Sequence, residues 1–523
     1  MTSQDLARPS LPIAIPHRQQ EASSDVFPSL KIHVKIKRKK TNFHGQSEFD
    51  VFASPVVLTD ATSLRYDCYT TIVEGDTQLT YSLVGGASYL VTKKDGANTE
   101  TVQCLPSGAL SFDLVLPALN DVVPIPSALI GNASVDCASD NLFKTSYHDA
   151  IFAVCASGSS GFTATGLDLT LDVEYLQNPV SISVPKLTDG SPPCDSVAMP
   201  TKVAPTTRAI LTGSSLPTAT SRRLKASAPM AIEAKSCTCK SIPRPCVFLH
   251  GLGTSNERAE LQDTPKLTQE KFGNIGDHAP CCTSVKYAVI NTVDAGWRND
   301  TLQQKFCDFS LSMSESSDVA TGTIADTIVV THSMGGLVMA AALAKGKFKF
   351  AESTSWVSLS APMMGSMAGD FIRDLCDGEF TKIVAGVLDL IGQCPASTAK
   401  KSIIYQNEKY STPEINAAYT AAQEAYRGNV TAAICSTSYH GVLSKFTPSC
   451  LVGGKLIPHK SKQNDALVEF QSGLGGLDPN LFGDSYLDRF YASKLNHADT
   501  ASLTHDGFFR DSQKPFKWFE CLL

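Results

Sequence analysis

The feature that most limits how this chain can fold is an apolar run that ends in a serine and two glycines. Residues 327–331 read Thr-Ile-Val-Val-Thr, and residues 332–336 read His-Ser-Met-Gly-Gly. The run predicts a buried strand, and the apolar stretch that continues to Ala344 is helix-like. The small residues between the two elements predict a tight strand-to-helix turn with Ser333 at its tip.

A serine at such a turn is a candidate nucleophile. The turn, known as the nucleophile elbow, holds the serine hydroxyl above a sheet, and the positive N-terminal end of the helix favours developing negative charge. The usual pattern is Gly-x-Ser-x-Gly, but Thr331 stands here in place of the first glycine. Threonine is larger than glycine, so we expect its neighbours to leave more room.

Residues 236–523 alternate apolar runs with helix-compatible stretches. Besides residues 327–331, apolar runs occur at residues 245–250, 285–290 and 356–360. Strands that are separated by helical segments predict a mostly parallel sheet covered on both faces, which is an α/β fold.

Two further motifs accompany the elbow. His250-Gly-Leu-Gly253 follows the first apolar run, and Ser360-Ala-Pro-Met-Met-Gly-Ser366 follows the fourth. Together with the elbow, they make residues 236–523 resemble an α/β-hydrolase of the lipase and serine-esterase type. The resemblance covers a little over half of the chain.

The resemblance implies an oxyanion hole and a triad. The backbone N–H groups of Leu252 and Met334 would hold the oxyanion, while an acid and then a histidine would follow Ser333 along the chain. Residues 462–470, which include Asp465, resemble the segment that carries the acid in lipases. Residues 494–500, which include His497, resemble the segment that carries the histidine. We expect a triad of these residues, and the rival candidates are Asp478, Asp484 and Asp488 for the acid and His505 for the base.

These residues predict a serine hydrolase that cleaves carboxylic esters, with lipid esters as the first candidate substrates, through an acyl-enzyme. The imidazole must be neutral to accept the serine proton, so activity should fall in acid. No metal or other cofactor is expected, because the Cys-x-Cys and Cys-Cys spacings at residues 237–239 and 281–282 do not match zinc-site pairs. One alternative is an acyltransferase with the same triad. The other is a non-catalytic binding or adhesion protein with a decayed hydrolase domain, and the complete triad argues against it.

The preceding part of the chain has the period of β-strands. Between Leu30 and Ile36, and again over residues 167–175, apolar residues alternate with polar ones. Asp95-Gly96 reads as a turn between strands. Short strands without long amphipathic helices predict a smaller β-sandwich-like domain over residues 30–180. We expect it to be an accessory domain, with binding to surfaces as its suggested role.

Two segments lack any pattern that could build a core. Residues 1–29 are polar and aperiodic, which predicts a disordered N-terminus. Residues 181–235 are rich in Pro, Ser and Thr, and residues 185–229 contain no aromatic side chain. An extended, mobile linker is therefore expected there, in which Arg222 and Arg223 are solvated.

Composition restricts the function and the compartment. Lys and Arg number 45 against 51 Asp and Glu, a net charge of −6, which argues against a general nucleic-acid binder. No apolar stretch is long enough to predict a transmembrane segment. The 16 cysteines favour disulfides and a secreted, extracellular protein. Residues 1–30 nevertheless contain no apolar core of a signal peptide.

Overall fold

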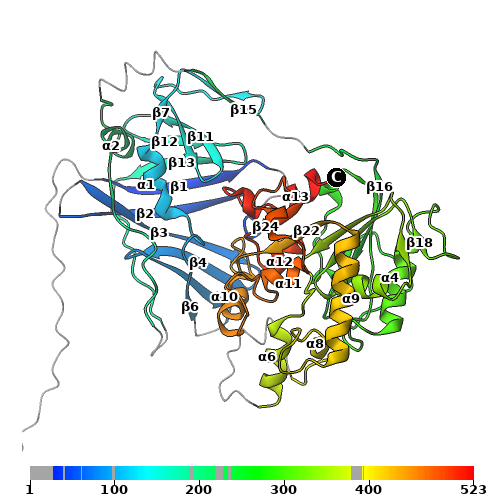
Figure 1. The fold of residues 1–523 in the computed structure, drawn as a ribbon. Coiled ribbons are helices and arrows are strands. Elements are labelled where there is room, and N and C mark those ends of the chain that lie inside the picture. The colour runs from blue at the N-terminus through cyan, green and yellow to red at the C-terminus, as the bar shows by residue number, and fades with distance from the viewer. Residues whose placement is uncertain are drawn as a thin grey trace, which may run out of the picture.

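The computed structural model describes residues 27–38, 42–59, 62–96, 100–187, 192–217, 228–233, 237–378, 392 and 394–523. The described chain forms an antiparallel, β-rich part and a part of alternating strands and helices, and the two lie against each other (Figure 1). Residues 1–26 and the pair Arg222-Arg223, on which two of the predictions above fall, lie outside the described residues.

Within the described residues, twelve strands form one antiparallel sheet. Strand β1 pairs with β2 on one side and with β13 on the other, so that Leu30 lies opposite both Ala53 and Tyr175. The sheet order is β6 (Glu100–Cys104), β5 (Ala87–Lys94), β4 (Thr77–Val84), β3 (Ser63–Glu74), β2 (Glu48–Val57), β1 (Ser29–Ile36), β13 (Leu169–Leu176), β12 (Gly161–Thr165), β11 (Ala150–Ala156), β10 (Leu142–Tyr147) and β7 (Val123–Pro124), with β14 (Thr201–Lys202) beside β3.

The sheet differs from the predicted sandwich of two separate sheets. Because β1 joins the first strands of this part to its last strand, the strands continue edge to edge in one sheet. Side chains from both halves of that sheet, such as Val51 and Val154, share one core, so the sheet curves around its inner face. The short helices η1 (Phe112–Leu114) and α1 (Val115–Asn120) cover that face. A small second sheet contains β15 (Met230–Ile232), β8 (Ala128–Ile130) and β9 (Ala133–Ser134).

Residues 192–217 also differ from the prediction, because they are not an extended linker. Strand β14 pairs with β3, and Cys194 forms a disulfide with Cys104. Helix α2 (Pro205–Thr212) begins with a proline and ends at Gly213 in a left-handed conformation, which are favoured positions for both residue types. This helix packs an apolar face into the β-rich part, where Thr207, Ala209, Ile210 and Leu211 are buried.

The remainder of the chain contains a seven-stranded sheet in which every neighbouring pair is parallel. This agrees with the α/β architecture predicted for residues 236–523. The sheet order is β17 (Cys282–Tyr287), β16 (Arg244–Leu249), β19 (Ile328–His332), β21 (Ser355–Leu359), β22 (Val430–Ser436), β24 (Phe490–Ser493) and β23 (Phe482–Gly483), and the short pair β18 (Thr323–Ile324) and β20 (Lys349–Phe350) lies apart.

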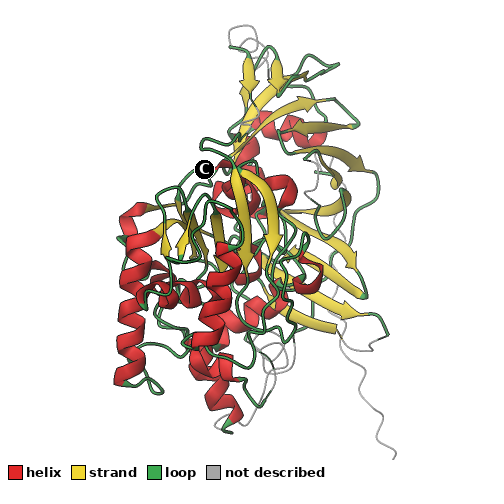
Figure 2. Cartoon of the chain, turned by 90° about the vertical axis from the view of Figure 1, so that its right-hand side faces the viewer, coloured by secondary structure: helices red, strands yellow, loops and turns green. Residues whose placement is uncertain are grey.

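Alternate side chains of these strands pack into two layers. Val247 and Val329 face the core formed with helices α4 (Asp300–Leu311), α5 (Met334–Ala344) and α9 (Pro413–Asn429). Phe248 and Val330 face the opposite core, which includes Trp518 of α13 (Pro515–Cys521). Figure 1 shows α4 and α9 on the side of this sheet that lies away from the β-rich part, and Figure 2 shows long helices beside the strands of this part. The other helices are α6 (Met367–Cys376), α8 (Thr398–Ser402), α10 (Thr447–Leu456), α11 (Phe470–Leu474), α12 (His497–Thr500), η2 (Pro265–Thr268), η3 (Gly276–His278), η4 (Pro479–Leu481) and η5 (Asp511–Gln513).

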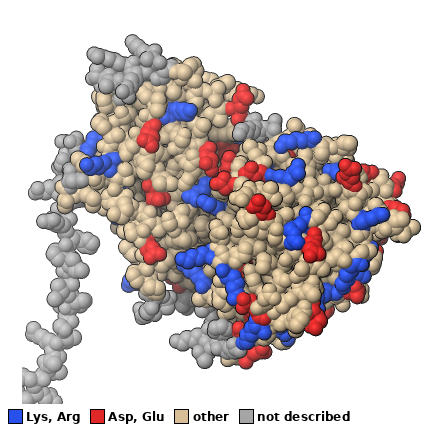
Figure 3. Space-filling model, viewed as in Figure 1, with Lys and Arg blue, Asp and Glu red and all other residues tan. Residues whose placement is uncertain are grey.

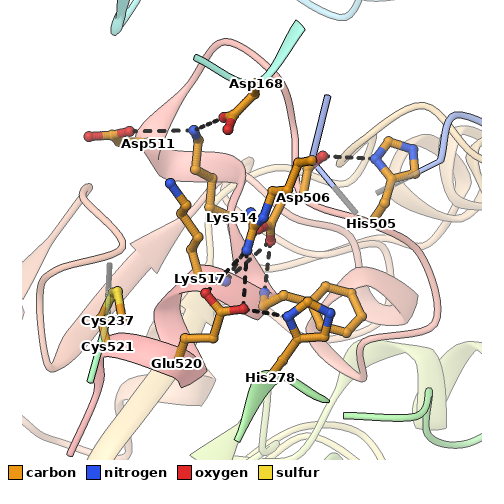
Figure 4. A network of polar contacts seen from close by, with 12 residues as sticks. Asp168, Cys237, His278, His505, Asp506, Asp511, Lys514, Lys517, Glu520 and Cys521 are labelled. Carbon is orange, nitrogen blue, oxygen red and sulfur yellow. Dashed lines mark hydrogen bonds and ion pairs between the residues drawn. A yellow bond between two sulfur atoms is a disulfide. The ribbon is translucent and has the colours of Figure 1, made fainter. Parts of the chain in front are cut away.

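A network of ion pairs joins the two parts of the molecule (Figure 4). The Arg38 guanidinium, just after β1, contacts Asp506 and lies 3.2 Å from a carboxylate oxygen of Glu520. The Lys514 amine lies 3.3 Å from Asp168. These cations therefore lie beside carboxylates where the β-rich part meets the C-terminal segment.

The outer surface carries mixed charge. On the face in Figure 3, Lys and Arg side chains are interspersed with Asp and Glu side chains. None of the helices in the described ranges is both long and apolar enough to cross a membrane.

Six disulfides occur, in both parts of the chain. They are Cys104–Cys194, Cys137–Cys155, Cys237–Cys521, Cys239–Cys281, Cys246–Cys282 and Cys376–Cys394. The four other cysteines are buried thiols. Six disulfides are typical of a protein in an oxidising environment.

Candidate active site

Ser333 occupies a sharp turn between β19 and α5, as the sequence predicts. Its backbone has φ 55° and ψ −133°, a conformation that non-glycine residues rarely adopt. The Ser333 N–H donates to the Leu359 carbonyl at 2.9 Å, which ties the turn to β21. Met334 is the first residue of α5, and the first N–H groups of a helix have no intrahelical acceptor. The partly buried serine thus lies beside an N–H group that can donate a hydrogen bond to an anionic partner.

The His-Gly-Leu-Gly loop packs directly against this turn. A Cβ atom on Gly251 would lie 2.6 Å from the Ser333 Cβ and 3.1 Å from the Met334 nitrogen. A Cβ atom on Gly335 would lie 2.7 Å from the His250 carbonyl oxygen. Only glycine allows the two backbones to approach this closely. The structure therefore brings the loop that contains Leu252 next to the N-terminus of α5.

The fit of Thr331 explains how the elbow tolerates a residue larger than glycine. Thr331 is fully buried, and its hydroxyl oxygen accepts a hydrogen bond from the Trp356 indole N–H at 2.9 Å. Gly336 faces it from α5, where an added Cβ would lie 3.4 Å from the Thr331 hydroxyl and 2.5 Å from the Ala361 Cβ. Gly336 is therefore required by its close approach to Ala361, whereas Thr331 fits because the Trp356 indole satisfies its buried hydroxyl.

His250 fixes the loop from inside the protein. Its Nε2 accepts the Ile290 N–H at 3.2 Å, so Nδ1 carries the proton and donates it to the Gly251 carbonyl at 2.8 Å. Burial lowers the His250 pKa to about 4. Thr292 adds a second anchor, because its hydroxyl oxygen accepts the Gly253 N–H at 3.1 Å. His250 is therefore a neutral residue that positions the loop.

Asp465 and His497 form a buried hydrogen-bonded pair. His497 Nδ1 lies 2.8 Å from Asp465 Oδ2. The other carboxylate oxygen accepts the N–H groups of Leu467 at 3.0 Å and Val468 at 2.7 Å. Burial opposes ionisation of Asp465, but His497 and these N–H groups outweigh it and hold the pKa of the carboxyl below its ordinary value. Asp465 is thus a carboxylate whose oxygens are all engaged.

The loop around His497 is held by its own capping residues. The Asn496 side chain accepts the N–H groups of Ala498 and Asp499, while an Asp499 carboxylate oxygen accepts the Asn496 N–H in return. The same oxygen accepts the Val442 N–H at 2.9 Å. Burial raises the Asp499 pKa to about 7. These contacts fix His497 at the first position of α12.

His332 connects the two halves of the site. Its ring centroid lies 4.7 Å from that of His497, and its Nε2 donates to the His497 carbonyl at 3.2 Å. Ser333 directly follows His332, so the turn and the Asp465–His497 pair are neighbours. The described residues include no hydrogen bond between the Ser333 hydroxyl and His497. Because Asp465 engages Nδ1 of His497, a hydrogen bond from the Ser333 hydroxyl would require Nε2.

The rival residues lie elsewhere. His505 contacts the carbonyl groups of Asp506 at 2.9 Å and Leu443 at 3.3 Å, and it lies in the contact region between the two parts (Figure 4). Asp478 caps η4, Asp484 is exposed, and Asp488 accepts the Ser485 N–H at 3.0 Å.

Two contacts near the Asp465 loop could not be predicted from the sequence. The Ser366 hydroxyl donates to the Leu467 carbonyl, which links the Pro-x-x-Gly-Ser segment to the loop that carries Asp465. His459 Nδ1 pairs with Glu469 at 2.8 Å, and both side chains are buried. No spacing in the sequence marks this pair. Among the described residues, no group of three or more His, Cys, Asp or Glu side chains could hold a metal ion.

No known protein family matches the sequence, and no curated protein matches it either. Among solved structures, Bacillus licheniformis lipase BlEst2 in mature form is similar at 14% identity over 50% of this chain and 88% of its own, with a TM-score of 0.32. The Staphylococcus hyicus lipase is similar at 11% identity over 54% of this chain and 94% of its own, with a TM-score of 0.27. A puromycin-hydrolyzing peptidase from Mycobacterium tuberculosis is similar at 11% identity over 77% of this chain and 59% of its own, with a TM-score of 0.20. Similarity at this level identifies neither a family nor a reaction.

Proposed function

We propose that this protein is a serine hydrolase of the α/β-hydrolase superfamily that cleaves carboxylic esters, with lipid esters as the first substrates to test. The observation that carries the proposal is the strained Ser333 turn beside the buried Asp465–His497 pair. Strain at a polar residue is costly and is typical of functional sites. A histidine that is oriented by a buried carboxylate is the arrangement that activates a serine nucleophile.

Acylation follows from these positions. The Ser333 oxygen attacks the ester carbonyl carbon, and its proton passes to Nε2 of His497. The N–H groups of Leu252 and Met334 hold the carbonyl oxygen as it becomes negative, and losing one such donor typically costs ~2.7–4 kcal/mol of barrier. The carbon–oxygen bond to the alcohol then breaks as His497 protonates the leaving alcohol. Asp465 stabilises the imidazolium in between.

Deacylation repeats these steps with water. His497 takes a proton from water, the water oxygen attacks the acyl carbon, and Ser333 recovers its proton as the carboxylic acid leaves. An acyltransferase would use the same residues with an alcohol in place of water. Product analysis in the presence of an added alcohol separates the two reactions, because only transfer yields a new ester.

Secretion is part of the same proposal. The six disulfides support it, because they persist in oxidising compartments and are rare in the cytosol. Recovery of the protein from the culture medium of its natural host, with its disulfides intact, would test the assignment. Recovery only from the cytosol would contradict it.

The test of the catalytic proposal is Ser333→Ala, assayed with p-nitrophenyl esters of increasing chain length. We expect kcat to fall by at least ~10⁴-fold, since triad members act as a unit. Ser312→Ala is a matched control, because this serine hydroxyl donates to the Phe309 carbonyl on the exposed end of α4. Circular dichroism should show that both variants are folded. Turnover by Ser333→Ala within a few-fold of wild type would exclude Ser333 as the nucleophile.

A further inference from the structure

The β-rich part contains a cavity of about 250 Å³ inside its curved sheet. Side chains from both halves of the sheet line it, including Val51 of β2 and Val154 of β11, and α1 closes one side. Phe508 and Phe509 of the C-terminal segment complete the lining. None of Ser333, Asp465 and His497 lines this cavity, so it is distinct from the candidate active site.

The lining is largely apolar, and most of its hydroxyl groups have hydrogen-bond partners within the protein. The Thr70 hydroxyl donates to the Asp50 carbonyl at 2.8 Å, and the Tyr147 hydroxyl donates to the Ser111 carbonyl. The cation of the lining, Arg65, is paired with Asp67 at 3.0 Å. These groups therefore have partners without a ligand.

Asp113 is the exception. Its Oδ1 atom is buried and has no hydrogen-bond partner in the described ranges of the chain. Burial raises the pKa of this carboxyl. A buried polar oxygen without a partner is costly, and a ligand group that donates a hydrogen bond would remove the cost. The cavity thus combines apolar walls with one unsatisfied acceptor, which is the usual composition of a small-molecule site.

The size of the cavity suits a flexible chain. Apolar cavities of ~150 Å³ remain dry and bind molecules as small as benzene. A cavity of about 250 Å³ has room for a longer ligand. An empty cavity of this kind leaves its lining atoms without contacts on one side, and an aliphatic chain would restore them.

We propose that this cavity binds a single-chain aliphatic alcohol, with its chain among the apolar walls and its hydroxyl group donating to Asp113. A fatty acid fits less well, because its carboxylate would face the Asp113 carboxyl while Arg65 is already paired. The proposal does not depend on esterase activity, since an alcohol carries no ester bond and its binding does not require Ser333.

The first experiment measures displacement of N-phenyl-1-naphthylamine, a neutral fluorophore, by 1-alkanols of increasing length. Each added methylene should tighten binding about fourfold until the cavity is filled, after which affinity should level off. Ala118→Phe places a ring in the cavity wall and should weaken 1-decanol binding by at least ~100-fold, the equivalent of several buried methylenes. Ala133→Phe is the matched control, because Ala133 is exposed on β9 and does not line the cavity.

The second experiment tests the role of Asp113. Wild type should prefer 1-decanol to decanoate at pH 8, and Asp113→Asn should reduce that preference at least tenfold, because the amide can donate to a carboxylate. If Ala118→Phe does not fold, Ala109→Leu provides the blocking variant, because Ala109 also lines the cavity. The proposal is overturned if wild type binds no alkanol up to its solubility limit. It is equally overturned if a folded blocking variant binds 1-decanol as wild type does, or if Asp113→Asn leaves the preference unchanged.

Discussion

Replacing Asp465 by asparagine tests whether this carboxylate sets the tautomer of His497. Asp465 accepts hydrogen bonds from His497 Nδ1 and from the N–H groups of Leu467 and Val468. In Asp465→Asn, the amide oxygen can keep the two backbone bonds, which leaves the NH₂ group facing His497. An NH₂ group only donates, so Nδ1 would have to accept and the imidazole proton would move to Nε2. That tautomer cannot take the Ser333 proton.

The expected loss in kcat is ~10⁴-fold, as for the same change in other Ser-His-Asp triads, and it corresponds to ~5 kcal/mol of barrier. KM should change little, because Asp465 is buried behind His497. The assay is p-nitrophenyl ester hydrolysis at pH 8, with urea denaturation to show that the variant is folded. Asp478→Asn is the matched control and should keep kcat within a few-fold, since Asp478 only caps η4. A folded Asp465→Asn enzyme with more than a tenth of wild-type kcat would refute this reasoning, as would an inactive Asp478→Asn enzyme.

Three other predictions concern His497 as the general base, the four cysteine thiols outside the disulfides, and His250 in the His-Gly-Leu-Gly loop. His497→Ala should lower kcat by ~10²–10⁴-fold, whereas His505→Ala should leave it within a few-fold, and comparing the two kcat values decides between them. The four cysteines outside the disulfides are buried, so iodoacetamide should label no cysteine in the native protein and four cysteines after unfolding without reductant, as counted by mass spectrometry. Labelling of more than four cysteines would contradict the disulfide assignment. Burial lowers the His250 pKa from 6.5 to about 4. Between about pH 6.5 and pH 4, His250 is therefore protonated in the unfolded chain but neutral in the folded protein. Stability from this residue should therefore be complete above pH 6.5 and fall by ~3 kcal/mol as the pH drops to 4, and urea denaturation of His250→Gln should show a correspondingly weaker pH dependence.

Local patterns predicted the strands and the elbow well. The alternation from Leu30 to Ile36 corresponds to β1, where Leu30 and Val34 are buried, and the run at residues 327–331 corresponds to β19. These features depend on residues that are adjacent in the sequence, so the period of the side chains is sufficient to find them. The pairing of His497 with Asp465 remained an expectation from resemblance, because no local pattern fixes a contact across 32 residues.

The features that the sequence did not predict depend on distant contacts. Whether the β-rich strands form one sheet or two depends on the pairing of β1 with β13, which lies more than a hundred residues away. Helix α2 is hard to predict because its segment is rich in proline, although Pro205 and Gly213 stand where helices favour these residues at their two ends. The buried pair of His459 and Glu469 has no signal in either sequence position.

The most direct test of the proposed function is labelling with a fluorophosphonate, followed by peptide mapping. The reagent forms a covalent bond with a serine only where the hydroxyl is activated and the oxyanion is stabilised. We predict one adduct, on the peptide that contains Ser333, with complete loss of ester hydrolysis at one equivalent of label. An adduct on another residue, or an active esterase that takes up no label, would contradict the proposal.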